Sequence, residues 1–408
     1  MTTEYRITRL GHHGDGITEG PLFAPLTLPG EVVTGTPEGD RLADLRIVTP
    51  SADRVAPPCR HFKSCGGCQL QHASDPFVAT WKQDIVARAL AANGLEAPFR
   101  PIHTSPPQSR RRATLSARRT KKGALAGFHA RASDTIIEIP GCQLLHPDLM
   151  KALPVAEALA IAASSRRGEL SLAVTVCENG LDIAVTGGLP LEGPLLATLA
   201  QEAQRFDLAR LTWDGEIVAT RHTPAQRFGK AQVVPPPGAF LQATREGEAA
   251  ILAAIREIVG GAAKIVDLFA GCGTFSLPLA AQAEIHAVEG SAAMIEALDR
   301  GWRQAQGLKL VTAETRDLFR RPLMPDELAR FDACVIDPPR AGAEAQIAEL
   351  AGARIPRIAH VSCNPVTFAR DAATLCAAGY ALERVQVIDQ FRWSSHAELV
   401  GCFSLTSA

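Results

Sequence analysis

The chain has no long apolar run and no surplus of charge of one sign. No uninterrupted apolar stretch approaches the roughly 20 residues that a membrane span requires, and the N-terminus carries no charged-plus-apolar signal segment. These absences exclude a membrane protein and predict a cytoplasmic one. The 42 basic and 43 acidic residues leave a net charge of -1, so a nucleic acid could be bound only through local basic patches.

Disulfides are not expected either, although the sequence contains ten cysteines. Without a secretory signal, so many cysteines indicate metal ligands, a catalytic thiol or merely buried side chains. The 408 residues, of which 46% are hydrophobic, can bury more than one core, and roughly two to three domains are expected. We expect the chain to act as a monomer.

Composition and turn residues divide the chain into four sections. In section 1–50, alternating segments at 5–10 and 31–35 are separated by a glycine-rich stretch and by Pro29-Gly30, which is typical of a small β-barrel. Section 51–94 holds a cysteine-rich stretch and a helical pattern over 77–93. Section 95–235 mixes strands and helices, and the consecutive prolines at 235–237 mark the start of section 236–408.

Section 236–408 alternates regularly between strand and helix patterns. Strands are predicted at 264–269, 285–289, 308–311, 331–336, 358–361, 382–388 and 398–405, with helices near 245–259, from 274, from 291 and near 366–377. This alternation predicts an α/β fold with a doubly wound, mostly parallel sheet. Ligands bind beyond the carboxyl ends of such strands, where the pattern places Gly271, Glu289, Asp317, Asp337 and Cys363.

A glycine turn follows the first strand of that sheet. Gly271 and Gly273 could serve a dinucleotide, a flavin or S-adenosylmethionine, or could form only a tight turn. The third glycine of the dinucleotide fingerprint is missing. Because Glu289, at the end of the next strand, is placed to accept hydrogen bonds from a ribose diol, we favour S-adenosylmethionine.

Cys363 has two interpretations: it is a small buried thiol, or it is a nucleophile at the carboxyl end of a strand of the sheet. Carbon 5 of uracil is too poor a nucleophile to accept a methyl group unaided, so a thiolate must first add to C6 and a base must later remove the C5 proton. Glu398 is the proposed base and His396 a positioning group, whereas the alternative for Glu398 is an ordinary surface carboxylate.

Three motifs resemble those of the uracil-C5 RNA methyltransferase family. Ser362-Cys363-Asn364-Pro365 is similar to its nucleophile motif, His396-Ala397-Glu398 to its base motif, and the segment that begins with Asp337-Pro338-Pro339-Arg340 to its acidic active-site turn. The order argues against DNA cytosine-C5 methyltransferases, whose nucleophile follows a proline.

This resemblance implies a class I S-adenosylmethionine-dependent methyltransferase that makes 5-methyluridine in RNA. It implies catalytic roles for Cys363, Glu398, Asp337 and His396, and cofactor contacts at Gln242, Phe269, Gly271, Gly273, Thr274, Glu289, Asp317 and Asp337. Ribosomal 23S RNA is the favoured substrate, because the combination of barrel and cysteine motif resembles the rRNA-modifying members. A tRNA substrate and a catalytically silent RNA-binding protein are the alternatives.

Cys59, Cys65 and Cys68 form a Cys-x5-Cys-Gly-Gly-Cys motif, and three thiolates need a fourth ligand. Cys142 is the best candidate, with His72 as the alternative for a zinc site. The spacing of the cysteines alone does not favour zinc over an iron-sulfur cluster. A third interpretation is that the three thiols bind no metal. The family resemblance implies a structural [4Fe-4S] cluster held by Cys59, Cys65, Cys68 and Cys142.

The parts outside the catalytic section resemble RNA-binding modules. Section 1–50 resembles the small TRAM-like β-barrel of the family, and section 95–235 is expected to be a central α+β RNA-binding domain. Its densest basic patch comprises residues 110–112 and 118–122, which could contact phosphates or could be a solvated surface.

Overall fold

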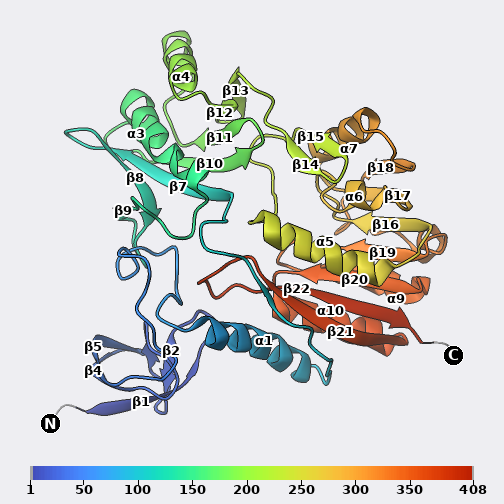
Figure 1. Cartoon of the computed structure of the whole chain (residues 1–408), viewed down its shortest axis with the longest axis horizontal. Helices are drawn as coiled ribbons and strands as arrows, with labels where there is room; N and C mark the ends of the chain where they lie inside the picture. Colours follow the sequence, from blue (N-terminus) through green and yellow to red (C-terminus); the bar gives the residue numbers. More distant parts are fainter. Residues whose placement is uncertain (1–2, 407–408) are drawn as a thin grey trace.

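The computed structural model describes residues 3–406. Figure 1 shows a small barrel at the N-terminal end, a separate central sheet with its own helices, and a larger sheet that carries the C-terminal half of the chain. A segment with little regular structure joins the barrel to the other two parts. Within the described residues, no helix combines the length and apolar character that a bilayer span requires.

The N-terminal part is a closed barrel with strand order β1-β2-β3-β5-β4. Its strands are β1 (Glu4–Leu10), β2 (Gly16–Thr18), β3 (Phe23–Ala24), β4 (Val32–Glu38) and β5 (Arg41–Thr49). Ile7, Ala24, Val33 and Leu42 fill its interior. The small β-barrel that the alternating pattern of section 1–50 predicted is therefore confirmed.

The cysteine-rich segment leads into helix α1 (Asp75–Ala91). An added Cβ at Gly66 would stand 2.9 Å from the carbonyl oxygen of His129, so the segment can approach the central sheet this closely only with glycine there. Helix α1 begins two residues earlier than predicted, because Ser74 caps it by accepting a hydrogen bond from the Phe77 N–H at 3.3 Å.

The central part is a seven-stranded sheet with order β13-β12-β11-β10-β7-β8-β9. Its strands are β7 (Arg112–Arg119), β8 (Ala124–His129), β9 (Ile136–Glu138), β10 (Leu170–Cys177), β11 (Gly180–Thr186), β12 (Arg210–Trp213) and β13 (Glu216–Thr220), and its helices are α2 (Pro147–Met150), α3 (Ala152–Ala163) and α4 (Gly193–Arg205). A hairpin of β14 (Gln226–Phe228) and β15 (Ala231–Val233) follows. This part therefore contains the expected mixture of strands and helices, arranged as an α+β structure.

The C-terminal part contains an eight-stranded sheet with order β18-β17-β16-β19-β20-β22-β21-β6. Its strands are β6 (His103–Thr104), β16 (Lys264–Leu268), β17 (Glu284–Glu289), β18 (Val311–Thr315), β19 (Ala333–Ile336), β20 (Arg357–Ser362), β21 (Tyr380–Asp389) and β22 (Glu398–Leu405). Strands β16 to β20 are parallel, and β22 is antiparallel to both of its neighbours. The predicted doubly wound, mostly parallel sheet is confirmed.

Helices cover both faces of this sheet. Helices α5 (Arg245–Val259), α6 (Ser276–Leu279) and α7 (Ala292–Gln304) lie on one face, and α1, α8 (Pro325–Leu328), α9 (Glu344–Ala353) and α10 (Pro365–Ala377) lie on the other. The helix expected from residue 274 has a single turn, because β17 begins at Glu284. The strand expected at 308–311 lies at 311–315 instead, since the backbone of Lys309 bonds to Ala280 and to the Trp302 indole.

Candidate active site

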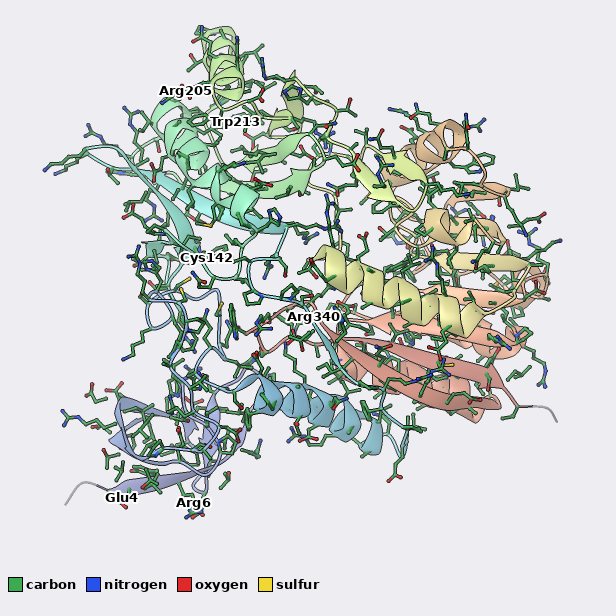
Figure 2. The ribbon with its side chains drawn as sticks, in the orientation of Figure 1. Glu4, Arg6, Cys142, Arg205, Trp213 and Arg340 are labelled. Carbon is green, nitrogen blue, oxygen red and sulfur yellow. The ribbon has the colours of Figure 1, made fainter. Side chains whose placement is uncertain are left out.

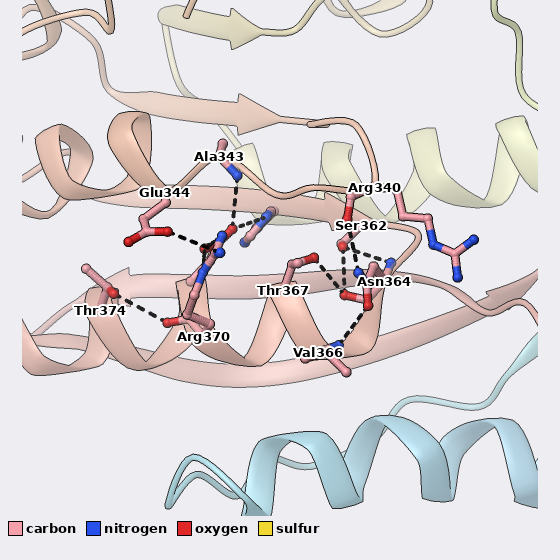
Figure 3. A network of polar contacts seen from close by, with 11 residues as sticks. Arg340, Ala343, Glu344, Ser362, Asn364, Val366, Thr367, Arg370 and Thr374 are labelled. Atoms are coloured by element: carbon pink, nitrogen blue, oxygen red, sulfur yellow. Dashed lines mark hydrogen bonds and ion pairs between the residues drawn. The ribbon is translucent and has the colours of Figure 1, made fainter. Parts of the chain in front are cut away.

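Cys363 lies in a tight turn between β20 and α10. Asn364 caps α10: its Oδ1 accepts the N–H of Val366 at 3.1 Å, and its Nδ2 donates to the carbonyl oxygen of Arg340 at 3.0 Å. Figure 3 shows this cap between the two loops that follow β19 and β20. The turn therefore presents the partly exposed thiol at the carboxyl edge of the sheet, and Asn364 ties it to the Asp337 motif.

An antiparallel pairing places Glu398 at the same edge of the sheet as Cys363. Ser362, the residue before Cys363, pairs with Leu399, the residue after Glu398. The start of β22 consequently lies at the carboxyl end of β20. Glu398 is buried, with 3% of its surface exposed, so the alternative of an ordinary surface carboxylate is wrong.

The ionisable groups of Cys363, Glu398 and Asp337, which follows β19, influence one another's pKa values. Burial, with the charges of Glu398 and Asp337, raises the pKa of the Cys363 thiol to about 11, and Arg340 opposes this shift. Burial raises the pKa of Glu398 to about 7, against a hydrogen bond from Gln390. Burial and the charge of Glu398 also raise the pKa of Asp337 well above its usual value. Glu398 can therefore exchange a proton near neutral pH.

Two glutamines connect the carboxylates. The Gln242 Nε2 donates to Asp337 at 3.3 Å, and the Gln390 Nε2 donates to Gln242 at 2.6 Å and to Glu398 at 2.9 Å. Gln242 was expected to contact the cofactor, whereas Gln390 was not singled out in the sequence. Gln390 belongs to none of the three motifs, and its place beside Glu398 follows from the return of the chain between β21 and β22.

The expected cofactor residues gather at the carboxyl edge of β16 to β19. Glu289 accepts hydrogen bonds from the backbone N–H of Gly271 at 3.1 Å and of Ser291 at 2.9 Å, which holds the glycine turn against the end of β17. A Cβ at Gly273 would lie 2.9 Å from side-chain atoms of Leu277 and Leu298. Glycine is therefore required there for close packing as well as for its positive φ.

The remaining cofactor candidates border the same edge. Phe269 has a φ of 61°, and its ring centroid lies 5.4 Å from that of Phe319. Asp317 is exposed and accepts the backbone N–H of Phe319 at 3.0 Å. Thr274 lies in the turn that precedes α6. The structure thus brings together Phe269, Gly271, Gly273, Thr274, Glu289 and Asp317 around the ends of neighbouring strands.

Two cavities meet at Cys363. One, of about 410 Å³, lies between the barrel, α1 and the catalytic sheet, and its basic lining residues are Arg9, His12, His13, Arg88, Arg340 and His396. No carboxylate side chain of the described residues lines this cavity. The other, of about 490 Å³, extends to the cysteine-rich segment at Gly66 and Gly67 and to Arg110 and Phe128 of the central part. The barrel, the cysteine-rich segment, the central part and the C-terminal part therefore all contribute residues to the cavities that Cys363 lines.

His396 and Arg340 line both cavities together with Cys363. The His396 ring packs edge-on against Phe391, with centroids 5.9 Å apart, and burial beside Arg340 lowers its pKa. The imidazole is therefore mainly neutral at neutral pH. Figure 2 shows Arg340 near the centre of the molecule, where the three parts approach one another.

The four predicted ligand cysteines line one small cavity. Cys59, Cys65, Cys68 and Cys142 surround it together with apolar side chains that include Phe62, Phe128, Ile139 and Leu144. Burial raises the pKa of Cys68 to about 12 and also raises the pKa values of Cys65 and Cys142, and the neighbouring thiolates add to each shift. His72 does not line the cavity. In residues 3–406, no group of three His, Cys, Asp or Glu side chains is arranged to hold a single metal ion.

One part of the predicted basic patch is buried. Arg111 is 4% exposed and pairs with Glu248 at 2.5 Å, so its expected role as a phosphate contact is wrong. A guanidinium inside the protein needs a fixed partner, and the N-terminal turn of α5 supplies one. Arg119, Lys121 and Lys122 remain exposed in the β7–β8 hairpin.

The doubly wound sheet, the glycine turn backed by Glu289 and the polar groups on its carboxyl edge define a class I S-adenosylmethionine-dependent methyltransferase. Residues 236–404 match the family model described as tRNA (Uracil-5-)-methyltransferase. An uncharacterized RNA methyltransferase of Mesorhizobium japonicum is 46% identical over 405 residues, covering 98% of this chain and 97% of the relative. The 23S rRNA (uracil(1939)-C(5))-methyltransferase RlmD of Halomonas elongata is 34% identical, covering 97% and 88%.

A solved structure has the same fold over nearly the whole chain. It is the tRNA (uracil-54, C5)-methyltransferase of Pyrococcus abyssi in complex with S-adenosyl-L-homocysteine, with a TM-score of 0.77, 21% identity and coverage of 98% of this chain and 100% of that one. The chain belongs to the uracil-C5 RNA methyltransferase family. The family and enzyme class predicted from the motifs are confirmed.

Proposed function

We propose that the enzyme methylates C5 of a uridine in 23S rRNA through a covalent bond between Cys363 and C6 of the base. The observation that carries this proposal is that Cys363, which lines a basic cavity, lies at the same edge of the sheet as the buried carboxylate of Glu398. A thiol and a base are the two groups that substitution at C5 of uracil requires.

The first step is addition of the Cys363 sulfur to C6. With a pKa of about 11, on the order of one thiol in ten thousand is ionised at pH 7. We therefore propose that the thiol loses its proton to the nearby Asp337 carboxylate as it adds to C6, so that Glu398 stays ionised for the later removal of the C5 proton. Addition makes C5 an enolate-like carbon, and the neutral form of Asp337 can donate a hydrogen bond to the oxygen where this charge develops.

The last step regenerates the enzyme. S-adenosylmethionine supplies the methyl group that C5 accepts. Glu398 then removes the proton that remains on C5, the electrons of the C–H bond re-form the C5–C6 double bond, and the sulfur of Cys363 leaves C6. A pKa of about 7 suits Glu398 to this task, because its basic form is well populated at neutral pH and is still a strong enough acceptor.

The residues at the carboxyl edge fit the cofactor. Glu289 uses its carboxylate to accept two backbone N–H groups and retains lone pairs for a ribose diol. Phe269 and Asp317 border the same turn and would complete the adenosine site. The Gly271 turn leaves the backbone open for close approach of the ligand.

The basic cavity supports RNA as the macromolecule that approaches Cys363. Its arginines and histidines come from the barrel, α1 and the catalytic part, so a bound strand would contact all three. The target base must leave its stack to meet the thiol. The Halomonas relative, named for 23S rRNA, is 34% identical over nearly the whole chain and favours that substrate, with tRNA as the second candidate.

A direct test compares the two RNA classes. Ribosomal RNA and tRNA from a strain lacking this protein should be incubated with the enzyme and labelled S-adenosylmethionine, and 5-methyluridine should then be mapped. Label confined to 23S rRNA supports the proposal, label in tRNA supports the second candidate, and absence of label from both contradicts RNA methylation by this chain.

We further propose that the enzyme acts in the cytoplasm as a monomer.

We also propose that the four cysteines hold a [4Fe-4S] cluster. They face one cavity with an otherwise largely apolar lining, and their thiol pKa values are raised by burial and by one another, so they would become thiolates only around a positively charged group. Cys142 comes from the central part and the other three from the segment after the barrel. The cluster would therefore fix these two parts relative to each other, with no redox role in methyl transfer.

A further inference from the structure

The orientation of the Gln390 side chain is determined by a backbone group. Gln390 is 1% exposed, and the N–H of Ala243 points at its amide oxygen at 2.8 Å. A backbone N–H can only donate, so the Gln390 atom that faces it must be the oxygen. The Gln390 NH₂ group is then the end that faces Gln242 and Glu398.

The same logic fixes the next amide. The Gln390 NH₂ can only donate, so the Gln242 atom 2.6 Å away must be the oxygen. The Gln242 NH₂ therefore faces Asp337, at 3.3 Å. Every donor in the series points in one direction, from Ala243 outward, and each carboxylate receives a hydrogen bond from a group that cannot give up its proton.

The buried Arg111 holds the anchor of this series in place. Its Nε donates to the Gln242 carbonyl oxygen at 3.1 Å, and its backbone N–H donates to the Ala243 carbonyl oxygen at 2.9 Å. Arg111 precedes β7, so the central part clamps both residues of the loop from which the Ala243 N–H projects. The central part thus helps to hold the loop whose Ala243 N–H sets the direction of the series.

We propose that Gln390 is a positioning residue for the base Glu398: its amide holds Oε2 of the carboxylate at 2.9 Å and leaves Oε1 free to accept the C5 proton. This inference rests on the proposed function, in which Glu398 is the base. Gln390 acts on the reaction through Glu398 and lies outside the three motifs.

The charged and titratable groups near Glu398 work against its ionised form, and the donor from Gln390 opposes them. Asp337 from the end of β19 and Cys363 from the end of β20 both become negative on ionisation, and Asp267 lies behind Asp337. Ionised Asp337 and ionised Cys363 both disfavour the ionised form of Glu398, whereas the positive charge of Arg340 opposes the shift at Cys363. The Gln390 N–H is the hydrogen bond that opposes the upward shift in the pKa of Glu398.

The test replaces the donor by a side chain of similar size. Gln390→Met removes the hydrogen bond to Glu398, so we expect the pKa that governs release of methylated RNA from Cys363 to rise by roughly one pH unit. Below that pKa the Glu398 carboxyl is protonated, release stalls, and the covalent adduct accumulates. Raising the pH should resolve it.

The measurement is a single-turnover reaction at pH 5.5 to 9, quenched in denaturant, with the adduct quantified on a denaturing gel. Gln346→Met is the matched control, because Gln346 is also buried and bonds twice to the Leu323 backbone, away from the site. This control should lose comparable stability with no change in the pH profile.

The outcomes separate the two proposals. If Glu398→Gln traps the adduct at every pH but Gln390→Met releases it with the wild-type profile, the inference about Gln390 is wrong and the proposed function stands. If Glu398→Gln releases product normally, the base assignment itself fails. A uniform drop in activity for Gln390→Met, without pH-dependent trapping, would show a structural role and contradict the inference.

Discussion

Ser362 in β20 and Leu399 in β22 are register partners, and this antiparallel pair places the thiol of Cys363 beside the carboxylate of Glu398. A parallel strand at this position would begin at the opposite edge of the sheet. The reversed direction of the β22 strand therefore assembles the catalytic pair from two distant motifs.

Blocking the first and last steps should give opposite results. Cys363→Ala is expected to abolish methylation and any covalent complex, because C5 never becomes nucleophilic without addition of sulfur. Glu398→Gln should still allow addition and methyl transfer, but its adduct should persist through denaturing electrophoresis because the C5 proton has no acceptor. An adduct formed by Cys363→Ala would refute the assignment of the nucleophile.

The reactivity of Cys363 should report its raised pKa. With a pKa of about 11, alkylation of this residue by iodoacetamide should accelerate about tenfold per pH unit from pH 7 to 9. Glu398→Gln should react faster at each pH, because the variant lacks one of the charges that raise the pKa. Peptide mapping by mass spectrometry separates Cys363 from the other cysteines, and a plateau below pH 8 would contradict the prediction.

The cluster assignment predicts metal content. Protein purified without oxygen should be brown and carry about four irons and four sulfides per chain. Cys142→Ser should lower this content and the midpoint temperature of unfolding, whereas Cys376→Ser, at a helix position far from the cavity, should retain both. Colourless protein with one zinc ion would overturn the assignment.

Exposed and buried basic residues of the predicted patch should respond differently to replacement. Replacing the exposed Arg119, Lys121 and Lys122 with Ala should weaken RNA binding and flatten its salt dependence, because fewer counterions are released. Replacement of the exposed Arg303 on α7 by Ala is the control. If the hairpin variant keeps the wild-type dependence of RNA affinity on salt, the hairpin is an ordinary solvated surface.

Arg111→Ala should instead reduce folding stability by about 3 kcal/mol, since it leaves Glu248 partly buried without its partner. Chemical denaturation measures this change. A stable Arg111→Ala variant with weakened RNA binding would restore Arg111 to the phosphate-binding patch.

Cofactor affinity should depend on Glu289. Glu289→Ala removes the acceptor for the ribose diol and the support of the Gly271 turn, so S-adenosylmethionine should bind about tenfold or more weakly, with RNA affinity retained. Glu284→Ala, at the exposed start of the same strand, is the matched control. Calorimetric titration measures both, and equal affinity of the two variants would remove Glu289 from the site.

The local pattern of residues was sufficient for much of this molecule. Alternation of apolar residues and the positions of glycine and proline indicated the barrel and the doubly wound sheet, because these signals act over a few residues. The motifs around Cys363, Asp337 and Glu398 were visible for the same reason, since each chemical group is accompanied by its own turn residues. The four cysteines could likewise be singled out, and the family and enzyme class followed.

Relationships between distant segments could be decided only by the folded chain. The burial of Arg111, the attachment of α1 and β6 to the catalytic sheet, and the position of Gln390 beside Glu398 depend on which surfaces meet. A glutamine or arginine has the same local pattern whether it faces water or a buried carboxylate. Its role is set by the partner across the interface, and long-range packing alone supplies that partner.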